Sequence, residues 1–240
     1  MSRPPSHPAS VPPAIACHEQ CFQFPTWTSF PLVQLTSARQ LSFDQTLARY
    51  QLTQADVVWA EQVHGAESAL VASRDRGHER AGCDALVTRD RGVPLAIRTA
   101  DCTPLFLYDP QQQVIGLAHV GWRGLAADLP TRVIRYFAQH VQSDPQQLVA
   151  GLGPAIRKCC YEVGPEVRAQ LPEDCEDHAG RTVLDIPSGI LRRLARAGLL
   201  SAHVHDGALC TACHVEQCYS VRREGAQTGR LLSLLMLRAS

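Results

Sequence analysis

Two short apolar runs joined by a turn set the strongest limit on the fold of this chain. Residues 105–108 and 114–119 are each of strand length, and the Asp-Pro-Gln-Gln sequence at 109–112 between them is typical of a hairpin turn. Antiparallel pairing of the runs would bring Cys102, at the start of the hairpin, close to His119 near its far end. The hairpin therefore predicts a thiol beside an imidazole.

The rest of the chain mixes strand and helix patterns and shows no internal repeat. Hairpins outnumber β-α-β units, which favours a mixed α/β (α+β) sandwich over a doubly wound sheet. We expect a flexible tail at 1–16 and a single domain at 17–240. Strands are predicted at 30–36, 57–63, 68–72, 84–88, 94–99, 149–153, 202–205 and 231–237, helices at 43–52, from 129 onward with Asp128 as the cap, at 164–171 and at 187–199, and a charged loop at 74–82.

Composition argues against several classes of function. Lysine plus arginine and aspartate plus glutamate number 23 each, and no basic stripe marks a nucleic-acid surface. No apolar run reaches the roughly 18 residues that span a bilayer, so no membrane partner is expected. Residues 1–16 hold five prolines and no signal peptide, which predicts a cytoplasmic protein. In that compartment we expect the ten cysteines to be reduced, some of them as metal ligands.

Three motifs carry the candidate chemistry. They are Gln-Val-His-Gly around His64, Arg-Thr-Ala-Asp-Cys ending at Cys102, and His-Val-Gly-Trp-Arg-Gly beginning at His119. Two imidazoles and a thiolate form a zinc set with one open position, which is typical of catalytic zinc. Each residue alone has a simpler interpretation, as a surface histidine or a small buried thiol. Gly65 is expected to permit a tight turn that aims His64 into a cleft.

Charged neighbours flank the proposed metal. Arg98 and Arg123 lie four positions outside Cys102 and His119, and a guanidinium fork suits phosphate or carboxylate. We expect them to bind an anionic substrate, with ordinary surface ion pairs as the alternative. Asp101 can orient a ligand or a water molecule beside Cys102.

A second cysteine group competes for the role of metal site. Cys210 and Cys213 are separated by two residues and followed by His214, which is a zinc-like local spacing, and Cys159 and Cys160 are further candidate ligands. The usual second pair with the same spacing is absent. Buried free cysteines are the simpler interpretation of this group.

Six motifs from Trp59 to Arg230 resemble one known family in order and spacing. Besides the three above, they are Cys-Asp-Ala-Leu-Val-Thr at 83–88, Gly-Pro-Ala-Ile at 153–156 with Cys-Cys-Tyr-Glu-Val-Gly at 159–164, and Tyr-Ser-Val-Arg-Arg at 219–223 with Thr-Gly-Arg at 228–230. The chain resembles the YfiH-type laccase-domain family, also called the purine nucleoside phosphorylase or multicopper polyphenol oxidase family.

The resemblance implies a single-domain sandwich related to cysteine-hydrolase toxins. It implies zinc held by His64, Cys102 and His119, phosphorolysis of adenosine, inosine and methylthioadenosine, and deamination of adenosine. One segment departs from the pattern. Members usually carry an Arg-x-Gly-Gly-Val-Ser loop and an Asn-Leu segment before the first motif, whereas here Arg39 runs directly into Gln-Leu-Ser. Arg39 is the candidate for that loop's arginine, and the shorter loop predicts an altered substrate range or activity.

The residues and the resemblance together predict a zinc-dependent purine nucleoside phosphorylase and adenosine deaminase whose partners are purine nucleosides and phosphate. One alternative is a copper-dependent polyphenol oxidase, although one His-His-Cys set is a poor match to several copper centres. A second is a thiol hydrolase with Cys102 as nucleophile and His119 as base. The third is an editing or binding factor for cell-wall precursors.

Overall fold

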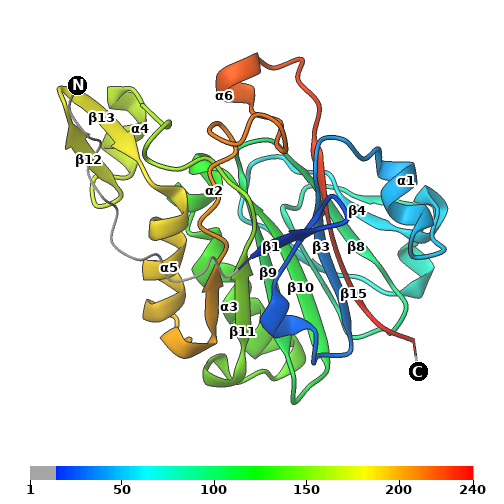
Figure 1. Ribbon diagram of the computed structural model, residues 1–240. Coiled ribbons are helices and arrows are strands. Elements are labelled where there is room, and N and C mark those ends of the chain that lie inside the picture. The colour runs from blue at the N-terminus through cyan, green and yellow to red at the C-terminus, as the bar shows by residue number, and fades with distance from the viewer. Residues whose placement is uncertain (1–14, 240) are drawn as a thin grey trace.

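The computed structural model of the chain describes residues 15–239. Two sheets pack face to face and helices cover the outer face of each, which makes four layers (Figure 1). The predicted mixed α/β sandwich is thus confirmed. The predicted tail at 1–16 lies almost entirely outside the described residues and stays a prediction, but Ile15 is buried and Ala16 begins the first strand.

The larger sheet, within residues 15–239, has seven strands in the order β1-β2-β3-β15-β8-β4-β6. Only β4 makes parallel pairs, with β8 and β6. β15 lies in the middle of this sheet, so the end of the chain is part of its core. The strands are β1 (Ala16–His18), β2 (Cys21–Gln23), β3 (Leu32–Ser37), β4 (Val58–Ala60), β6 (Glu79–Arg80), β8 (Leu95–Thr99) and β15 (Leu231–Leu237).

The second sheet contains the predicted hairpin, and its described strands run in the order β14-β11-β9-β10-β7-β5. β9 pairs antiparallel with β10, and His119 lies opposite Pro104, two positions from Cys102. The expected neighbourhood of thiol and imidazole is confirmed. The strands are β5 (Ser68–Leu70), β7 (Ala85–Thr88), β9 (Thr103–Asp109), β10 (Val114–Val120), β11 (Val149–Leu152) and β14 (Val204–Asp206).

Alternation along the central strands explains why the layers stack. In β10, Ile115 and Leu117 face the larger sheet, while Ala118 and Val120 face the helices. β15 alternates in the same way between the sheet interface and the side covered by helix α1 (Phe43–Ala48). Because successive side chains of a strand point to opposite faces, a continuous apolar run predicts a strand covered on both sides.

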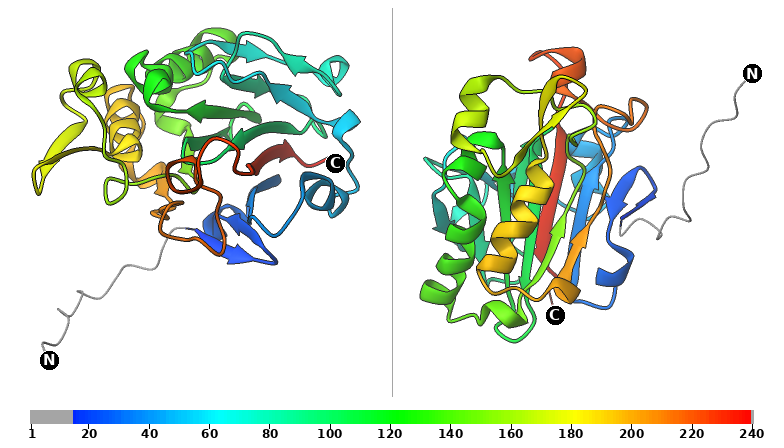
Figure 2. Two further views of the ribbon diagram at one scale, coloured as in Figure 1. Left: turned by 90° about the horizontal axis from the view of Figure 1, so that it is seen from above. Right: turned by 90° about the vertical axis from the view of Figure 1, so that its left-hand side faces the viewer.

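Helices cover the two outer faces. α1 packs on the larger sheet and α2, α3 and α5 on the smaller one, whereas α4 lies beside the hairpin at 175–184 (Figure 2). α3 presents the expected apolar face, and Asp128 occupies the N-cap position as predicted. Its backbone is left-handed, however, and its carboxylate accepts the Thr131 hydroxyl and caps no backbone N–H. The helices are α1 (Phe43–Ala48), α2 (Trp122–Ala126), α3 (Leu129–Val141), α4 (Pro165–Gln170), α5 (Ile186–Arg196) and α6 (Val221–Glu224), with 3-10 turns at Pro25–Trp27, Gln54–Asp56, Ser73–Asp75, Pro145–Gln147 and Ser201–His203.

Several short elements were not predicted. The hairpin of β12 (Cys175–His178) and β13 (Arg181–Leu184) is mostly exposed and charged, so it lacks apolar alternation. β1 and α6 are likewise exposed and short, and β6 lies inside the predicted loop at 74–82. The strand expected at 57–63 ends at Ala60, because Gln62 has a left-handed backbone.

Two further findings concern the described residues as a whole. Within residues 15–239, no helix is long and apolar enough to cross a membrane. The ten cysteines form no disulfide in this described part of the chain.

Candidate active site

His64, Cys102 and His119 converge at one end of the two sheets. His64 follows β4, Cys102 stands in the turn between β8 and β9, and His119 is near the end of β10. Their ligand atoms all lie within 4.8 Å of one another, and the imidazole rings meet edge to face with centroids 4.8 Å apart. His119 is buried and Cys102 half-buried, while His64 is exposed. The set therefore joins elements of both sheets and is open to solvent on the His64 side.

Asp84, just before β7, holds both histidines. Its buried carboxylate lies 2.8 Å from His119 Nδ1 and accepts the backbone N–H groups of His64, at 3.0 Å, and Gly65, at 2.7 Å. With Nδ1 bonded to the carboxylate, Nε2 of His119 is left for Cys102 and a metal. A single carboxylate thus orients one imidazole and positions the loop that carries the other.

The loop of His64 is shaped differently from the prediction. The left-handed backbone belongs to Gln62 and His64, with φ of 63° and 60°, and not to Gly65. The side-chain amide of Gln62 pairs with both the N–H and the C=O of Arg98, which attaches the loop to β8. Gly121 provides the close approach instead, because a Cβ there would lie 3.0 Å from Cys102 Sγ and 3.2 Å from His64 Cδ2.

The three side chains influence one another's protonation. Burial raises the pKa of the Cys102 thiol, but the imidazoles of His119 and His64 lower it by more than burial raises it. The resulting pKa is about 6. Burial lowers the pKa of His119, whereas the Cys102 thiolate and the Asp84 carboxylate raise it to about 9. At neutral pH the pair is therefore a thiolate beside an imidazolium, and a bound cation would take the place of the imidazolium proton.

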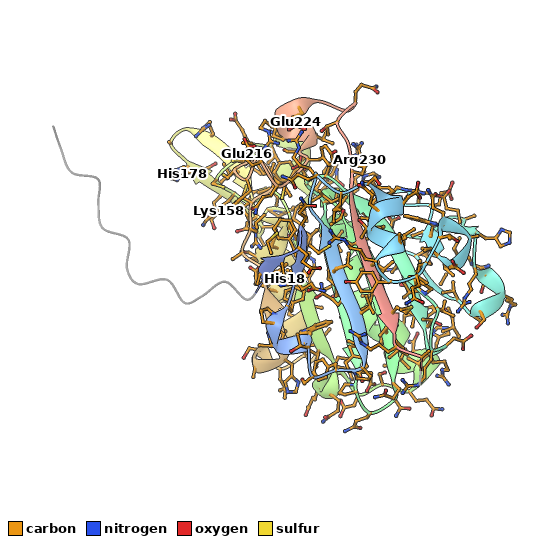
Figure 3. All side chains as sticks on the ribbon, turned by 45° about the vertical axis from the view of Figure 1, so that its right-hand side comes forward. His18, Lys158, His178, Glu216, Glu224 and Arg230 are labelled. Carbon is orange, nitrogen blue, oxygen red and sulfur yellow. The ribbon has the colours of Figure 1, made fainter. Side chains whose placement is uncertain are left out.

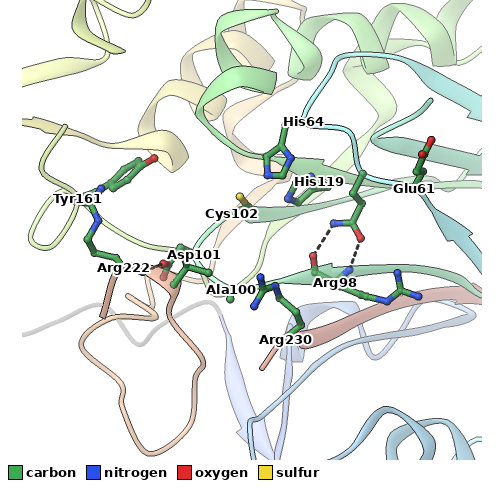
Figure 4. A pocket seen from close by; sticks show the side chains of 12 residues that line it. Glu61, His64, Arg98, Ala100, Asp101, Cys102, His119, Tyr161, Arg222 and Arg230 are labelled. Atoms are coloured by element: carbon green, nitrogen blue, oxygen red, sulfur yellow. Dashed lines mark hydrogen bonds between the residues drawn. The ribbon is translucent and has the colours of Figure 1, made fainter. Parts of the chain in front are cut away.

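A cavity of about 600 Å³ opens over this group (Figure 4). Arg98 lines it, but its guanidinium is 2.9 Å from Glu79 and 4.2 Å above the Trp59 ring, so its charge is already compensated. The other lining residues are Glu61, Gln62, His64, Ala100, Asp101, Cys102, His119, Tyr161, Val221, Arg222 and Arg230.

Two arginines that were not predicted also line the cavity. Arg230 donates to the main-chain oxygens of Thr228 and Gly229, and Arg222 to that of Glu162. Neither has a carboxylate within 4.0 Å among the described residues. Neither guanidinium is therefore ion-paired where a substrate would enter, although that of Arg222 lies 5.0 Å from the centre of the Tyr161 ring.

The other predicted residues are engaged by partners of their own. Arg123 is exposed on α2, stacks on Trp122 and does not line the cavity. Arg39 lines a different hollow and pairs with Glu224 at 2.8 Å. Asp101 borders the cavity, yet its carboxylate accepts the Thr211 hydroxyl at 2.6 Å and the N–H of Arg222 at 2.8 Å. Asp101 thus fastens the C-terminal loops beside Cys102.

Comparison with known proteins adds to this geometry. Residues 39–238 match a family model described as multi-copper polyphenol oxidoreductase laccase. The chain belongs to this family. The match spans most of the chain and includes all six motifs on which the resemblance was based.

Relatives agree in sequence and in fold. A purine nucleoside phosphorylase of Streptomyces coelicolor is 38% identical over 190 residues, which cover 76% of this chain and 76% of that protein. The purine nucleoside phosphorylase YlmD of Geobacillus stearothermophilus is 33% identical over 194 residues, covering 74% and 71%. The crystal structure of the latter organism's YlmD has a TM-score of 0.88 at 24% identity and covers 95% of this chain and 100% of that chain. The Bacillus licheniformis protein YfiH has a TM-score of 0.86 at 21% identity, covering 93% and 99%.

Proposed function

We propose that this protein is a zinc-dependent purine nucleoside phosphorylase that acts on adenosine, inosine and methylthioadenosine and also deaminates adenosine. The observation that carries the proposal is an open three-ligand set at the base of a cavity lined by arginines. A cavity of this size is typical of small-molecule sites. The relatives named as purine nucleoside phosphorylases support the same reaction.

The residues fit a zinc ion. Bonds of about 2.0–2.3 Å place tetrahedral ligands roughly 3.3–3.8 Å apart, and the three ligand atoms lie within 4.8 Å of one another. The Asp84 carboxylate on His119 Nδ1 is the usual support for a zinc-bound histidine. Copper binds the same ligand types, which is why metal content is part of the test below. When bound, zinc would supply Lewis acidity and lower the pKa of a water molecule for deamination.

Side chains of the cavity wall supply the remaining functions. For phosphorolysis, Arg230 and Arg222 would hold phosphate by charge-assisted hydrogen bonds, with Arg98 beside them. Burial, followed by the negative charge of Cys102, raises the pKa of Tyr161 to about 12, so its hydroxyl stays protonated. Tyr161 can therefore donate a hydrogen bond to a bound base or ribose.

The alternatives rest on narrower observations. The lowered pKa of Cys102 beside His119 suits a thiol hydrolase with Cys102 as nucleophile and His119 as base. The family description supports copper-dependent phenol oxidation. A precursor-binding factor would use the same cavity without turnover.

Chromatography of adenosine and inosine incubated with the protein separates these functions. With phosphate present we expect free base and ribose 1-phosphate, and without phosphate only inosine from adenosine. Elemental analysis of the same preparation should give zinc. The His64→Ala/His119→Ala variant should lose both reactions. No product from either nucleoside at full zinc content would contradict the proposal, and oxidation of phenols only by the copper-loaded protein would favour the oxidase.

A further inference from the structure

Four cysteines outside the active site converge on one point. The Sγ atoms of Cys159, Cys160, Cys210 and Cys213 all lie within 4.8 Å of one another. The Sγ of Cys213 is 3.7 Å from that of Cys159 and 3.4 Å from that of Cys160. Neither contact is a disulfide bond in this structure, because an S–S bond is about 2.05 Å long. The sequence indicated Cys159 and Cys160 as further candidate ligands beside Cys210 and Cys213. The simpler interpretation of the group as buried free cysteines is wrong, because Cys159 and Cys213 are exposed.

Backbone contacts bring the two segments together. A parallel bridge joins Ala155 to Cys210, and the turn after Cys210 folds back so that the N–H groups of Cys213 and His214 donate to its carbonyl oxygen. The guanidinium of Arg223 donates to the carbonyls of Thr211 and Ala212 inside that turn. In Figure 3, Lys158 and Glu216, which flank the two segments, lie at the same corner of the molecule.

We propose that these four cysteines bind a structural zinc ion. Tetrahedral zinc with Zn–S bonds of about 2.3 Å separates its sulfurs by roughly 3.8 Å, which is within the range seen here. Four thiolates fill the coordination sphere, so this site is closed, in contrast to the open set of His64, Cys102 and His119. A sulfur-only tetrahedral set selects zinc or iron among the common metals.

The position of the site indicates its purpose. Tyr161 directly follows Cys160 in the chain, and Arg222 lies just beyond the loop that contains Cys213. Both residues line the cavity of the candidate active site. Tyr161 lies outside the regular elements, and Arg222 lies on the four-residue helix α6. A zinc ion that joins the segments would fix this wall of the cavity.

Elemental analysis of variants tests the proposal on the full-length protein, purified with reductant and without added metal. We expect two zinc ions per chain in the wild type and one in the His64→Ala/His119→Ala variant. The Cys210→Ser/Cys213→Ser variant should also keep one, bound at the active site. Cobalt(II) in the histidine variant should give the strong thiolate-to-metal charge-transfer absorption of a four-sulfur site.

The exposed Cys17→Ser variant is the matched control and should keep both metals. A histidine variant without metal would overturn the proposal, as would a disulfide joining Cys213 to Cys159 or Cys160 in freshly isolated protein. Iron at one equivalent would overturn zinc as the occupant. The histidine variant decides the matter even where the serine variant does not fold. Catalysis is not part of the readout, so an inactive protein with two zinc ions would contradict only the proposed function.

Discussion

At the scale of single residues, Asp84 has the largest influence on the site. It is fully buried and accepts hydrogen bonds from two backbone N–H groups and from one imidazole, all within 3.0 Å. An amide has one acceptor oxygen and two N–H donors, so it cannot satisfy three donors. The orientation of two candidate metal ligands therefore depends on one carboxylate.

The Asp84→Asn variant should bind zinc about 10–100-fold more weakly, the usual effect of losing a group that supports a metal ligand. Competition with a chromophoric chelator measures the affinity. Asp109→Asn is the control, because that buried carboxylate also accepts two backbone N–H groups but lies at the opposite end of the β9–β10 hairpin. Equal zinc affinity in Asp84→Asn and wild type would show that Asp84 does not support zinc binding.

Arg230 gives the second prediction at this scale. Losing one charge-assisted contact costs about 1.5–3 kcal/mol, so Arg230→Ala should reduce phosphorolysis at limiting phosphate roughly ten- to a hundredfold. Deamination, which uses water, should change less. The exposed Arg132→Ala variant on α3 is the control. An unchanged dependence on phosphate concentration would contradict the role of Arg230 and leave Arg222 and Arg98 as the phosphate-binding residues.

At the scale of elements, α5 is held to the β12–β13 hairpin region by one carboxylate. Asp174, with a side chain 2% exposed, accepts from Arg193 at 2.9 and 3.1 Å and from Arg192 at 2.5 Å. The helix has Gly189 where a Cβ would approach this carboxylate to 2.8 Å. Burial raises the pKa of Asp174, but its hydrogen bonds to Arg193 and Arg192 lower it by more than burial raises it. The pKa of Asp174 is therefore below its ordinary value.

The free energy of unfolding of the Asp174→Asn variant should therefore be about 1.5–3 kcal/mol lower than that of the wild type at pH 7. Since the folded pKa is depressed, this stabilisation is present above the unfolded value near 3.9 and is lost as pH falls through the folded pKa. Urea unfolding should show that the difference in free energy of unfolding between the wild type and the Asp174→Asn variant is smaller at pH 3 than at pH 7. Glu173→Gln, which removes an exposed ion pair with Arg196, should change stability by less than about 1 kcal/mol. A gap of equal size at both pH values would contradict the assignment.

At the scale of the whole molecule, the candidate zinc site connects the two sheets. His64 follows a strand of the larger sheet, His119 belongs to the smaller one, and Cys102 lies where the chain crosses between them. Metal bound there stabilises only the folded state, by about 4 kcal/mol when free zinc is a thousandfold above its Kd.

Removal of metal by a chelator should thus lower the Tm of the wild type, and returned zinc should restore it. The loss should be smaller in the His64→Ala/His119→Ala variant, which keeps only the four-cysteine cluster. Differential scanning calorimetry at fixed protein concentration makes this comparison. A Tm that is insensitive to chelation at proven metal loss would show that the site does not link the sheets.

The amino-acid sequence by itself determined the architecture and the three candidate metal ligands of the site. Apolar runs of strand length set the layers, and a hairpin with a short turn is a local structure, so its register placed Cys102 beside His119. The motif around His64 completed the ligand set through its resemblance to a family. These features depend on neighbours along the chain or on recognisable patterns.

Only the tertiary structure decided the rest. Asp84 lies in a motif but carries no signal of its bonds to the His64 loop, because those bonds form across strands. Arg230 lines the cavity while Arg39 does not, since loop packing sets where each guanidinium points. Cys160 and Cys213 meet although 53 residues separate them. Contacts of this kind depend on how segments fold over one another, which spacing along the chain does not encode.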